Sequence, residues 1–356
     1  MLKNRLNACL AILGFCLVFT ACKVPAGTKA TENKNVPSDF GTNNNGDTTN
    51  IADLKWRRFF TDQNLINLID TAIVRNQELN ITLQEIETAN NDVLFRNGPL
   101  KPLVAARLGA GIEKVGRYTS QGAGDASTEI KPGKPVPEVI ADYSPNIYAS
   151  WEVDIWKKLR NSKKAAVSRY LASIEGKNFV LTNLVAEVAN SYYELLALDN
   201  QLEIVKQNIA LQQNALEVVK VQKQASKATE LAVQKFQAEV LRTQSLEFDI
   251  VQDIKETENR INFLLARYPQ DIPRDKAGFF GTVPAAVSSG LPSQLLANRP
   301  DIRQAELELA AAKLDVKVAR AEFYPSLDIT AMVGLQAFKP SYLVKLPESI
   351  FFLRYS

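Results

Sequence analysis

Two stretches of the chain, 223 residues apart, change from a helical to a strand pattern at matching prolines, Pro102 and Pro325. The change matters because side chains repeat every 3.6 residues around a helix and every 2 along a strand, so the two patterns demand different backbones. The same spacing also aligns identical residues at five further pairs, Glu85 with Glu308, Ala89 with Ala312, Asp92 with Asp315, Val93 with Val316 and Gly111 with Gly334. We therefore predict an internal duplication, each copy being a helix, two strands and a helix.

Strands are expected over residues 102–113, 143–156 and 325–336, where apolar and polar residues alternate. One face of these strands is apolar and is predicted to contact lipid: Val104, Ala106, Leu108, Ile147, Trp151, Val153, Leu327 and Ile329. The opposite face is polar and is predicted to line a water-filled lumen: Arg107, Glu152, Asp154 and Asp328. Each run is about ten residues, enough for a tilted strand to cross a bilayer. One such strand would suit a soluble sandwich, but three in matching register favour the membrane.

Residues 157–267 contain no proline and a single glycine, Gly176. Within them apolar residues recur every seven positions, which is typical of a coiled coil; they are Leu181, Val188, Leu195, Leu202, Ile209 and Leu216. A helix over 160–220 would be about 90 Å long, too long for a compact domain of this size. We expect it to reverse near residues 222–230, where Thr229 can cap a return helix. The segment 157–268 is thus predicted to be a long helical hairpin.

The N-terminus has the pattern of a secretion signal. Lys3 and Arg5 precede an apolar segment over residues 6–19, and small residues lead to Cys22. Such a segment is too short to be a membrane-spanning helix, so we expect a signal peptide over 1–21.

The residues around Cys22, Phe-Thr-Ala-Cys, resemble the lipoprotein box of bacteria, in which the cysteine is acylated and becomes the first residue. Lys23 follows instead of aspartate, which by this resemblance favours delivery to the outer membrane. Ordinary secretion with an incidental cysteine is the alternative. Residues 22–50 are rich in Thr, Asn and Gly and are predicted to be a lipid-anchored flexible tether.

The composition excludes several functional classes. The chain has no histidine and three cysteines, two of which, Cys9 and Cys16, lie in the predicted signal peptide. Metal sites built on His or Cys, Ser-His-Asp triads and disulfide frameworks are therefore excluded. The net charge is +3, with 42 basic and 39 acidic side chains interspersed, which argues against nucleic-acid binding. We predict no catalytic residues, no metal site and no cofactor.

A specific sequence follows the proline-containing segment 269–290. Residues 290–306 read GLPSQLLANRPDIRQAE, and residues 319–326 read ARAEFYPS. These stretches resemble the TolC/OprM-type outer-membrane factor family, the exit ducts of bacterial efflux pumps. The resemblance covers about residues 51–352, and its most specific part is the motif Arg299, Pro300, Asp301, Ile302 and Arg303. The motif itself suits the first turn of a helix, so we interpret it as a fold signature rather than a reaction centre.

The resemblance implies a mixed α and transmembrane β fold. Three chains of such proteins share a twelve-stranded outer-membrane β-barrel, which continues into a long periplasmic barrel of coiled-coil helices. General physics agrees with oligomerisation, because an open sheet edge leaves unpaired backbone groups in hydrocarbon and four strands are too few to close a barrel. The implied partners are a homotrimer, a periplasmic adaptor protein, an inner-membrane RND transporter and outer-membrane lipid. The implied function is a passive conduit for small molecules, which these partners open.

The expected organisation has a first repeat over 51–268, an equatorial connector over 269–290 and the start of a second repeat over 291–356. The second repeat has a helix over 291–323, the strand 325–336 and an incomplete return strand. It lacks a counterpart of the long hairpin. We therefore expect a C-terminally truncated family member that, as written, cannot assemble a working conduit.

Two alternatives stay open on the sequence alone. One is an outer-membrane duct for polypeptide secretion, which sequence separates poorly from an efflux duct. The other is a structural coiled coil anchored by lipid at Cys22, which would need no lipid-facing strands. An enzyme is the weakest reading because no constellation of residues supports one. The sequence identifies neither the cargo nor the gating residues.

Overall fold

The computed structural model describes residues 35–37, 55–276, 292–345 and 349–355. The predicted signal peptide 1–21, Cys22, most of the tether 22–50 and the connector from residue 277 to 290 lie outside these residues. The described chain forms two compact units. Unit 1 holds residues 89–170 and the described residues from 308 onward, and unit 2 holds the described residues of 55–88 and 171–307.

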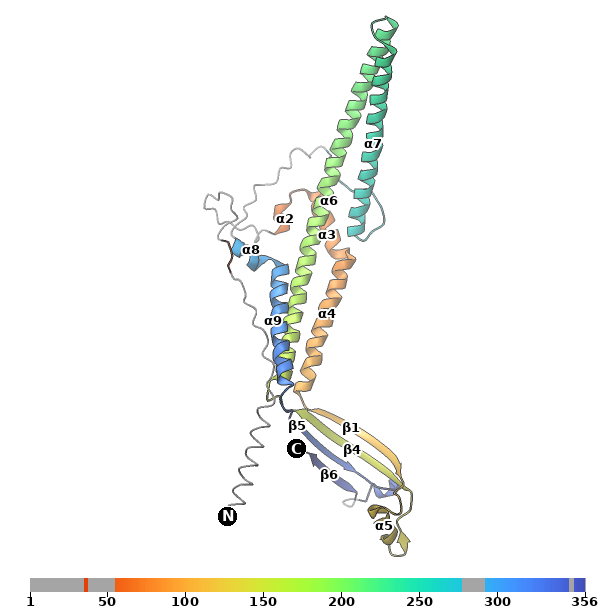
Figure 1. Cartoon of the computed structure of the whole chain (residues 1–356), viewed down its shortest axis with the longest axis vertical. Helices are drawn as coiled ribbons and strands as arrows, with labels where there is room; N and C mark the ends of the chain where they lie inside the picture. The colour runs from red at the N-terminus through yellow and green to blue at the C-terminus, as the bar shows by residue number, and fades with distance from the viewer. Residues whose placement is uncertain (1–34, 38–54, 277–291, 346–348, 356) are drawn as a thin grey trace, which may run out of the picture. The chain divides into compact units, whose positions relative to one another are not determined.

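Unit 1 is built on a four-stranded sheet in the order β1-β4-β5-β6 (Figure 1). Its strands are β1 Leu103–Glu113, β4 Ile140–Glu152, β5 Asp328–Leu335 and β6 Ile350–Tyr355. All three pairings are antiparallel. The two central strands come from different copies of the predicted duplication, so the β4–β5 ladder joins the copies.

The strand ends differ from the expected ones at β4, which runs over Ile140–Glu152 instead of 143–156. The ladder between β4 and β5 covers Asn146 to Glu152 and then stops, with a single further bridge between Tyr143 and Ala337. Pro145 lies in the interruption. Because proline has no backbone N–H to donate, it cannot complete a ladder on both sides of a central strand.

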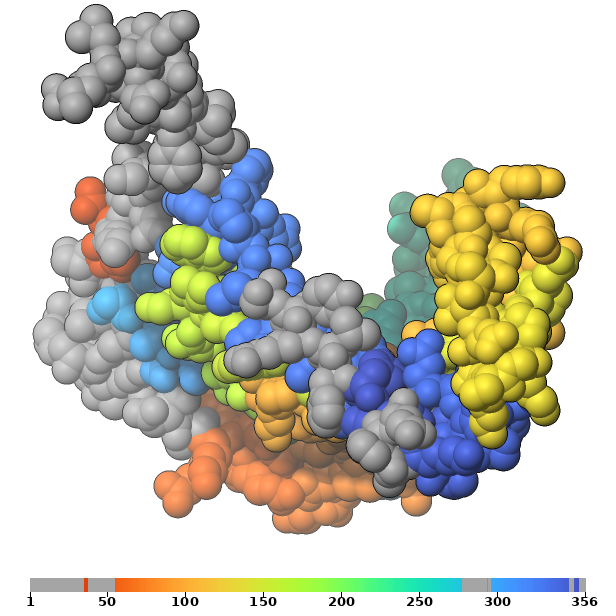
Figure 2. Space-filling model, turned by 90° about the horizontal axis from the view of Figure 1, so that it is seen from below, coloured from red at the N-terminus to blue at the C-terminus, as the bar shows by residue number. Residues whose placement is uncertain are grey.

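Both long connections of the sheet lie at one end, which we call the loop end. The β1–β4 connection contains helix α5 Ser120–Ser127 and a small hairpin of β2 Glu129–Lys131 and β3 Lys134–Pro135. The hairpin turns at Gly133, whose φ of 75° favours glycine. The β5–β6 connection contains the 3₁₀ turn η4 Pro340–Tyr342. In Figure 2 the yellow residues of the first connection lie beside blue residues of the second part of the chain.

Unit 2 is helical and contains the expected long hairpin. Helix α6 Lys158–Gln224 extends into it from unit 1 and is followed by α7 Glu230–Leu264. The connecting turn includes Ser226 with a φ of 58°, and the Thr229 side chain accepts a hydrogen bond from the backbone N–H of Ala232 at 3.3 Å. This confirms Thr229 as the cap of the return helix.

The heptad residues of α6 form the contact with α7. Four of the six are buried, and Leu181 and Leu202 pack against the same cluster half-buried. Their partners on α7 include Val240, Ile254 and Ile261. A seven-residue repeat keeps one seam facing the partner helix along its whole length, which is why the pattern was visible in the sequence.

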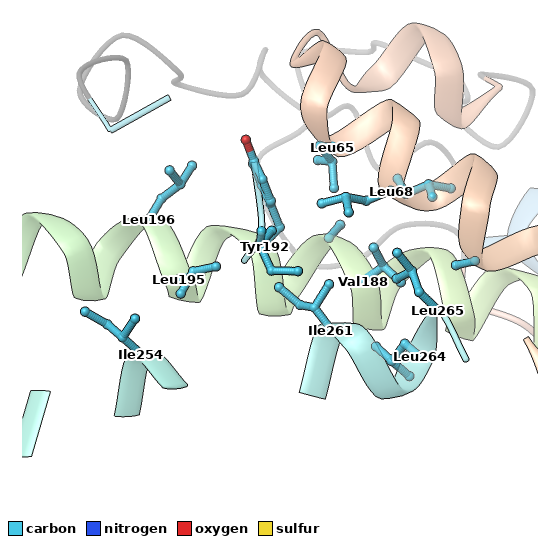
Figure 3. Packing of buried hydrophobic residues seen from close by; sticks show 14 of the residues in the cluster. Leu65, Leu68, Val188, Tyr192, Leu195, Leu196, Ile254, Ile261, Leu264 and Leu265 are labelled. Atoms are coloured by element: carbon cyan, nitrogen blue, oxygen red, sulfur yellow. The ribbon is translucent and has the colours of Figure 1, made fainter. Parts of the chain in front are cut away.

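A third helix completes the core of unit 2. After the short α2 Trp56–Phe59, α3 Gln63–Arg75 places Leu65 and Leu68 against α6 and α7 (Figure 3). Tyr192 of α6 is fully buried in this cluster, and its hydroxyl donates a 2.6 Å hydrogen bond to Asp62. The other carboxylate oxygen of Asp62 accepts from the backbone N–H of Asn64 and caps α3. The helix α4 Gln77–Asn97 then begins after Asn76 and leads into β1.

The helix expected over 291–323 is wrong as one element, because the structure has two. They are α8 Pro292–Asn298 and α9 Pro300–Ala321, separated at Arg299. A residue before proline is pushed out of the helical region, and proline is favoured at the first helical position. The break therefore follows from Pro300 itself.

Candidate functional site

The sheet of unit 1 places the predicted lipid-facing residues of all three predicted strands on one face. Residues directly opposite each other in an antiparallel pair share a face. Ala106 is opposite Ile147, and Ile147 is opposite Val333 in turn. Trp151 is opposite Ile329 in the same register. The predicted residues Val104, Leu108, Val153 and Leu327 belong to the same face by alternation and by a 2.8 Å backbone hydrogen bond from Val153 to Leu327.

This apolar face is open in the single chain. The side chain of Leu108 is 89% exposed, and that of Ile147 on a central strand is 54% exposed. Val104, Leu327, Ile329 and Val333 are exposed as well. Soluble monomers rarely leave a contiguous apolar face of this kind uncovered. A further apolar environment must therefore cover it, either lipid or protein.

The opposite face carries charges near the end of the sheet that lies away from the loop end, where β4 leads into α6. Glu152 and Asp328 are directly opposite each other on β4 and β5. Lys158, in the first turn of α6, binds the Glu152 carboxylate at 2.5 Å and offsets the repulsion between the two acids. Arg107 lies opposite Asn146 on the same face of the sheet, farther toward the loop end.

Asp154 corrects the predicted set of charged strand residues. It lies beyond the end of β4, and its almost fully buried carboxylate accepts hydrogen bonds at 3.0 Å from the backbone N–H groups of Leu159 and Arg160. The Arg160 side chain binds the same carboxylate. The free N–H groups of a helix N-terminus attract an acidic side chain, so Asp154 caps α6 instead of standing on the strand face.

Trp156, just beyond the end of β4, joins the two repeats. Its ring stacks on that of Tyr324, with centres 4.6 Å apart, and its indole N–H donates a 3.0 Å hydrogen bond to the carbonyl of Pro325. Lys157 follows with a φ of 62°, a backbone strain that turns the chain into α6. The beginning of α6 is thus tied to the beginning of the second repeat's strand.

The sequence motif at residues 299–303 has structural roles. Pro300 is the first residue of α9, and Asp301 in its first turn binds Arg299 at 2.5 Å. The Arg299 guanidinium lowers the pKa of the Asp301 carboxyl from its ordinary value. Arg303 binds the buried Glu175 of α6 at 2.8 Å and fastens α9 to the long hairpin.

A buried ionic cluster in unit 2 was not foreseen from the sequence. Arg274 binds Asp199 of α6, with Nη2 3.1 Å from Oδ1, and Glu258 of α7 at 2.8 Å. All three side chains are less than a tenth exposed. Lys276 binds Asp199 at 3.1 Å, and Lys255 binds Glu258 at 2.7 Å. The cluster attaches the beginning of the connector to both long helices.

The charges in this cluster set the ionisation of Asp199. Burial by itself raises the pKa of this carboxyl, but the hydrogen bonds from Arg274 and Lys276 outweigh it and hold the pKa below its ordinary value. The partners are 75 and 16 positions apart from Arg274. No short-range sequence pattern links Arg274 to Asp199 and Glu258. The charged residues after Pro273 are the one local feature that indicates a segment packed against the helices.

Among the described residues, no group of three or more His, Cys, Asp or Glu side chains is arranged to hold a metal ion. No helix in the described part of the chain has both the length and the apolar character needed to cross a bilayer.

Comparisons with known proteins place the fold. A family model described as "Outer membrane efflux protein" matches residues 68–267 and 291–341. The crystal structure of the open state of the MtrE outer membrane channel of Neisseria gonorrhoeae has a TM-score of 0.75 and 21% identity, covering 94% of this chain and 71% of that one. At this identity the likeness concerns the fold alone.

Two curated relatives from Pseudomonas putida are similar in sequence. The probable efflux pump outer membrane protein SepC is 29% identical over 287 residues, which cover 80% of this chain and 57% of SepC. The pyoverdine export outer membrane protein OpmQ is 28% identical over 326 residues, covering 91% of this chain and 67% of OpmQ. The chain thus spans between about half and two thirds of the length of these relatives.

Proposed function

We propose that this chain, which belongs to the outer membrane efflux protein family, is a subunit of a passive outer-membrane conduit. In this conduit it would contribute strands to the membrane barrel and helices to the wall, and the conduit would export small molecules. The observation that carries the proposal is the arrangement of β1, β4 and β5 in unit 1, which have one exposed apolar face and carry Arg107, Glu152 and Asp328 on the other. A strand in a wall between lipid and water needs this division, because lipid-facing and lumen-facing residues alternate along it. The lipid-facing set is Val104, Ala106, Leu108, Ile147, Trp151, Val153, Leu327 and Ile329, and the lumen-facing set is Arg107, Glu152 and Asp328.

The edges of the sheet support assembly with further copies. In the described residues β1 and β6 each have a neighbour on one side only. An edge strand in hydrocarbon would leave backbone N–H and C=O groups unpaired at a cost of several kcal/mol each. Pairing β1 of one copy with another chain removes this cost, so a homotrimer with a shared barrel is the assembly that we propose.

The helices offer a second surface for association. Apolar residues of α7 that point away from α6 are exposed, among them Leu241 and Phe248, which are seven positions apart. A second seam of this spacing suits contact with the helices of another copy. At the turn of the hairpin, Leu231 and Val221 are exposed as well. This turn is where we propose that the periplasmic adaptor and, through it, the inner-membrane RND transporter engage the conduit.

The cargo is proposed only as a class. OpmQ is named for pyoverdine export, whereas SepC is named only for an efflux pump, so we propose no cargo beyond the class of small molecules. The outer membrane is the proposed location, with acylated Cys22 as an additional anchor on the periplasmic side. A lipid-anchored coiled coil without a pore would not need the exposed apolar sheet face, which is why we favour the conduit.

Labelling of single cysteines in intact cells tests the proposal. Ala106→Cys, Trp151→Cys and Ile329→Cys place thiols on the apolar face, and Arg107→Cys places one on the opposite face, beside Ala106. We expect a membrane-impermeant maleimide to label Arg107→Cys at least tenfold faster than the other three, because lipid excludes the reagent.

Two controls make the result interpretable. Urea-denatured samples should label equally at all four positions, and immunoblots of outer-membrane fractions should show equal amounts of each variant. Labelling of the three apolar-face cysteines as fast as Arg107→Cys would contradict the conduit.

A further inference from the structure

Two lysines from separate connections converge on one aromatic ring at the loop end of the sheet in unit 1. The Lys131 ammonium lies 5.9 Å from the centre of the Tyr342 ring, and the Lys345 ammonium lies 5.1 Å from it. Lys131 belongs to the β1–β4 connection, whereas Tyr342 and Lys345 belong to the β5–β6 connection. The face of an aromatic ring attracts cations, so Tyr342 holds both groups.

The same residues line a cavity of about 340 Å³. Its wall also includes Ile130 and Phe338, and the Phe338 ring meets the Tyr342 ring edge-on with centres 5.1 Å apart. The buried Ser349 donates a 3.0 Å hydrogen bond to the carbonyl of Leu343, which holds the far side of the connection in place. The cavity thus combines a cationic rim with an apolar wall.

The cationic rim is not neutralised within the described part of the chain. Neither Lys131 nor Lys345 has a carboxylate of the described residues within ion-pair distance. Two nearby acids have other partners: Asp142 accepts a 3.0 Å hydrogen bond from the Gln336 side chain, and Glu129, two residues before Lys131, accepts one of 2.9 Å from the backbone N–H of Gly133. An anion in the cavity would therefore meet cationic groups that no described carboxylate occupies, and it would gain charge-assisted hydrogen bonds from them.

We propose that this cavity binds the phosphate group of a membrane lipid, with the phosphate between Lys131 and Lys345 and the apolar part of the lipid against Ile130 and Phe338. A compact ammonium group is a suitable partner for phosphate oxygens. The anion site stands on the cavity alone, whereas the lipid as its source rests on the proposed function, in which the sheet of unit 1 lies in the membrane.

Calorimetric titration of the full chain in a neutral detergent tests the proposal without a membrane or a working conduit. The probes are dihexanoyl phosphatidic acid, inorganic phosphate and dihexanoylglycerol, which is the same lipid without phosphate. We expect the phosphatidic acid to bind at least tenfold more tightly than inorganic phosphate, and dihexanoylglycerol not to bind measurably.

The variant Lys131→Gln/Lys345→Gln should weaken phosphatidic acid binding at least tenfold. Lys134→Gln is the matched control, since Lys134 lies in the same hairpin but has no contact with the Tyr342 ring. The affinity of this variant for phosphatidic acid should stay within twofold of wild type. Circular dichroism checks that each variant is folded, and if the double variant is not, each single variant should weaken binding about threefold.

The other outcomes overturn the proposal in distinguishable ways. Equal affinity for phosphatidic acid and inorganic phosphate, both lost in the lysine variant, would make this a site for free phosphate. Unchanged binding in the lysine variant, or equal binding of dihexanoylglycerol, would remove the anion site altogether. None of these results depends on the cysteine labelling that tests the conduit.

Discussion

At the scale of single residues, the chain fastens its helices with a few buried charges. Arg274 is buried between Asp199 and Glu258, whose additional partners, Lys276 and Lys255, are mostly exposed. A buried charge that loses its partner keeps its desolvation cost without the attraction that offset it. The sequence shows only isolated charges at these positions, since neither periodicity nor spacing reports contacts between residues so far apart in the chain.

Replacing Arg274 by alanine should destabilise unit 2 strongly. The change leaves two carboxylates buried without their shared cation, for which we expect a loss of about 3–5 kcal/mol in the free energy of unfolding. Urea denaturation of the full chain in detergent, followed by circular dichroism at the helical band, measures the loss. Arg260→Ala is the matched control: Arg260 pairs with Glu194 at 3.2 Å on the surface, and such pairs contribute about 0–1 kcal/mol. Equal losses for both variants would refute a special role for the cluster.

The ionisation of Asp199 should make this stability depend on pH. Because the folded state lowers the pKa of this carboxyl, its contribution is complete above the unfolded value of about 3.9 and is lost as the pH falls further toward the folded pKa. We expect Asp199→Asn to be less stable than wild type at pH 7, and the difference in urea midpoint to shrink below about pH 4. A difference that stays constant from pH 7 to pH 3 would show that the charge of Asp199 is not responsible.

At the scale of elements, the residue patterns predicted which helices and strands exist better than they predicted where each one ends. The long hairpin, its turn, the three strands and the helix start at Pro300 follow from periods and prolines that act locally. The predicted C-terminal end of β4 and the predicted position of Asp154 were wrong because both depend on the N-terminus of α6, whose free N–H groups bind the Asp154 carboxylate. The lipid-facing and lumen-facing assignments stay predictions, although the register of the sheet brings each set to one face.

Two glycines at matching positions of the duplication should respond differently to alanine. A Cβ on Gly334 would lie 2.5 Å from the Asn146 Cβ and 2.7 Å from the carbonyl oxygen of Pro145, whereas a Cβ on Gly111 would meet nothing within 4 Å. Because backbone atoms cannot move aside cheaply, we expect Gly334→Ala to cost about 1–3 kcal/mol.

Hydrogen exchange of the β4 and β5 amides in detergent is the measurement for these glycines. Exchange in Gly334→Ala should be faster than in wild type, whereas Gly111→Ala should match wild type. If both variants exchange alike, the close approach of β5 to β4 at this position is not tight.

At the scale of the whole molecule, the two copies of the duplication depend on each other. β4 of the first copy pairs with β5 of the second, and Trp156 binds the chain just before β5. The duplication was visible from Pro102 and Pro325, but the pairing between copies was not, because a sequence pattern shows which face of a strand is apolar and not which strand lies beside it.

Membrane insertion should be sensitive to the face on which a charge is placed. Ile147 and Tyr148 are neighbours on the central strand β4 and point to opposite faces. A lysine on the lipid face near the middle of a membrane strand costs about 2–4 kcal/mol. We therefore expect Ile147→Lys to reduce the amount of chain in the outer-membrane fraction severalfold, whereas Tyr148→Lys should be tolerated. Quantitative immunoblots of fractionated cells measure this, and a reversed order would assign the two faces the other way round.

The pairing of β4 with β5 also governs the order of events during synthesis. β4 ends at Glu152 and β5 begins at Asp328, so the ribosome makes the whole helical hairpin before the second partner of β4 exists. Pairings between residues this far apart in the chain slow folding, because the chain loses the conformational entropy of loop closure before the new contact contributes any stability. Until then the β1–β4 ribbon has an unprotected edge and an uncovered apolar face. The nascent chain therefore passes through an aggregation-prone interval that lasts at least as long as the synthesis of residues 153–327.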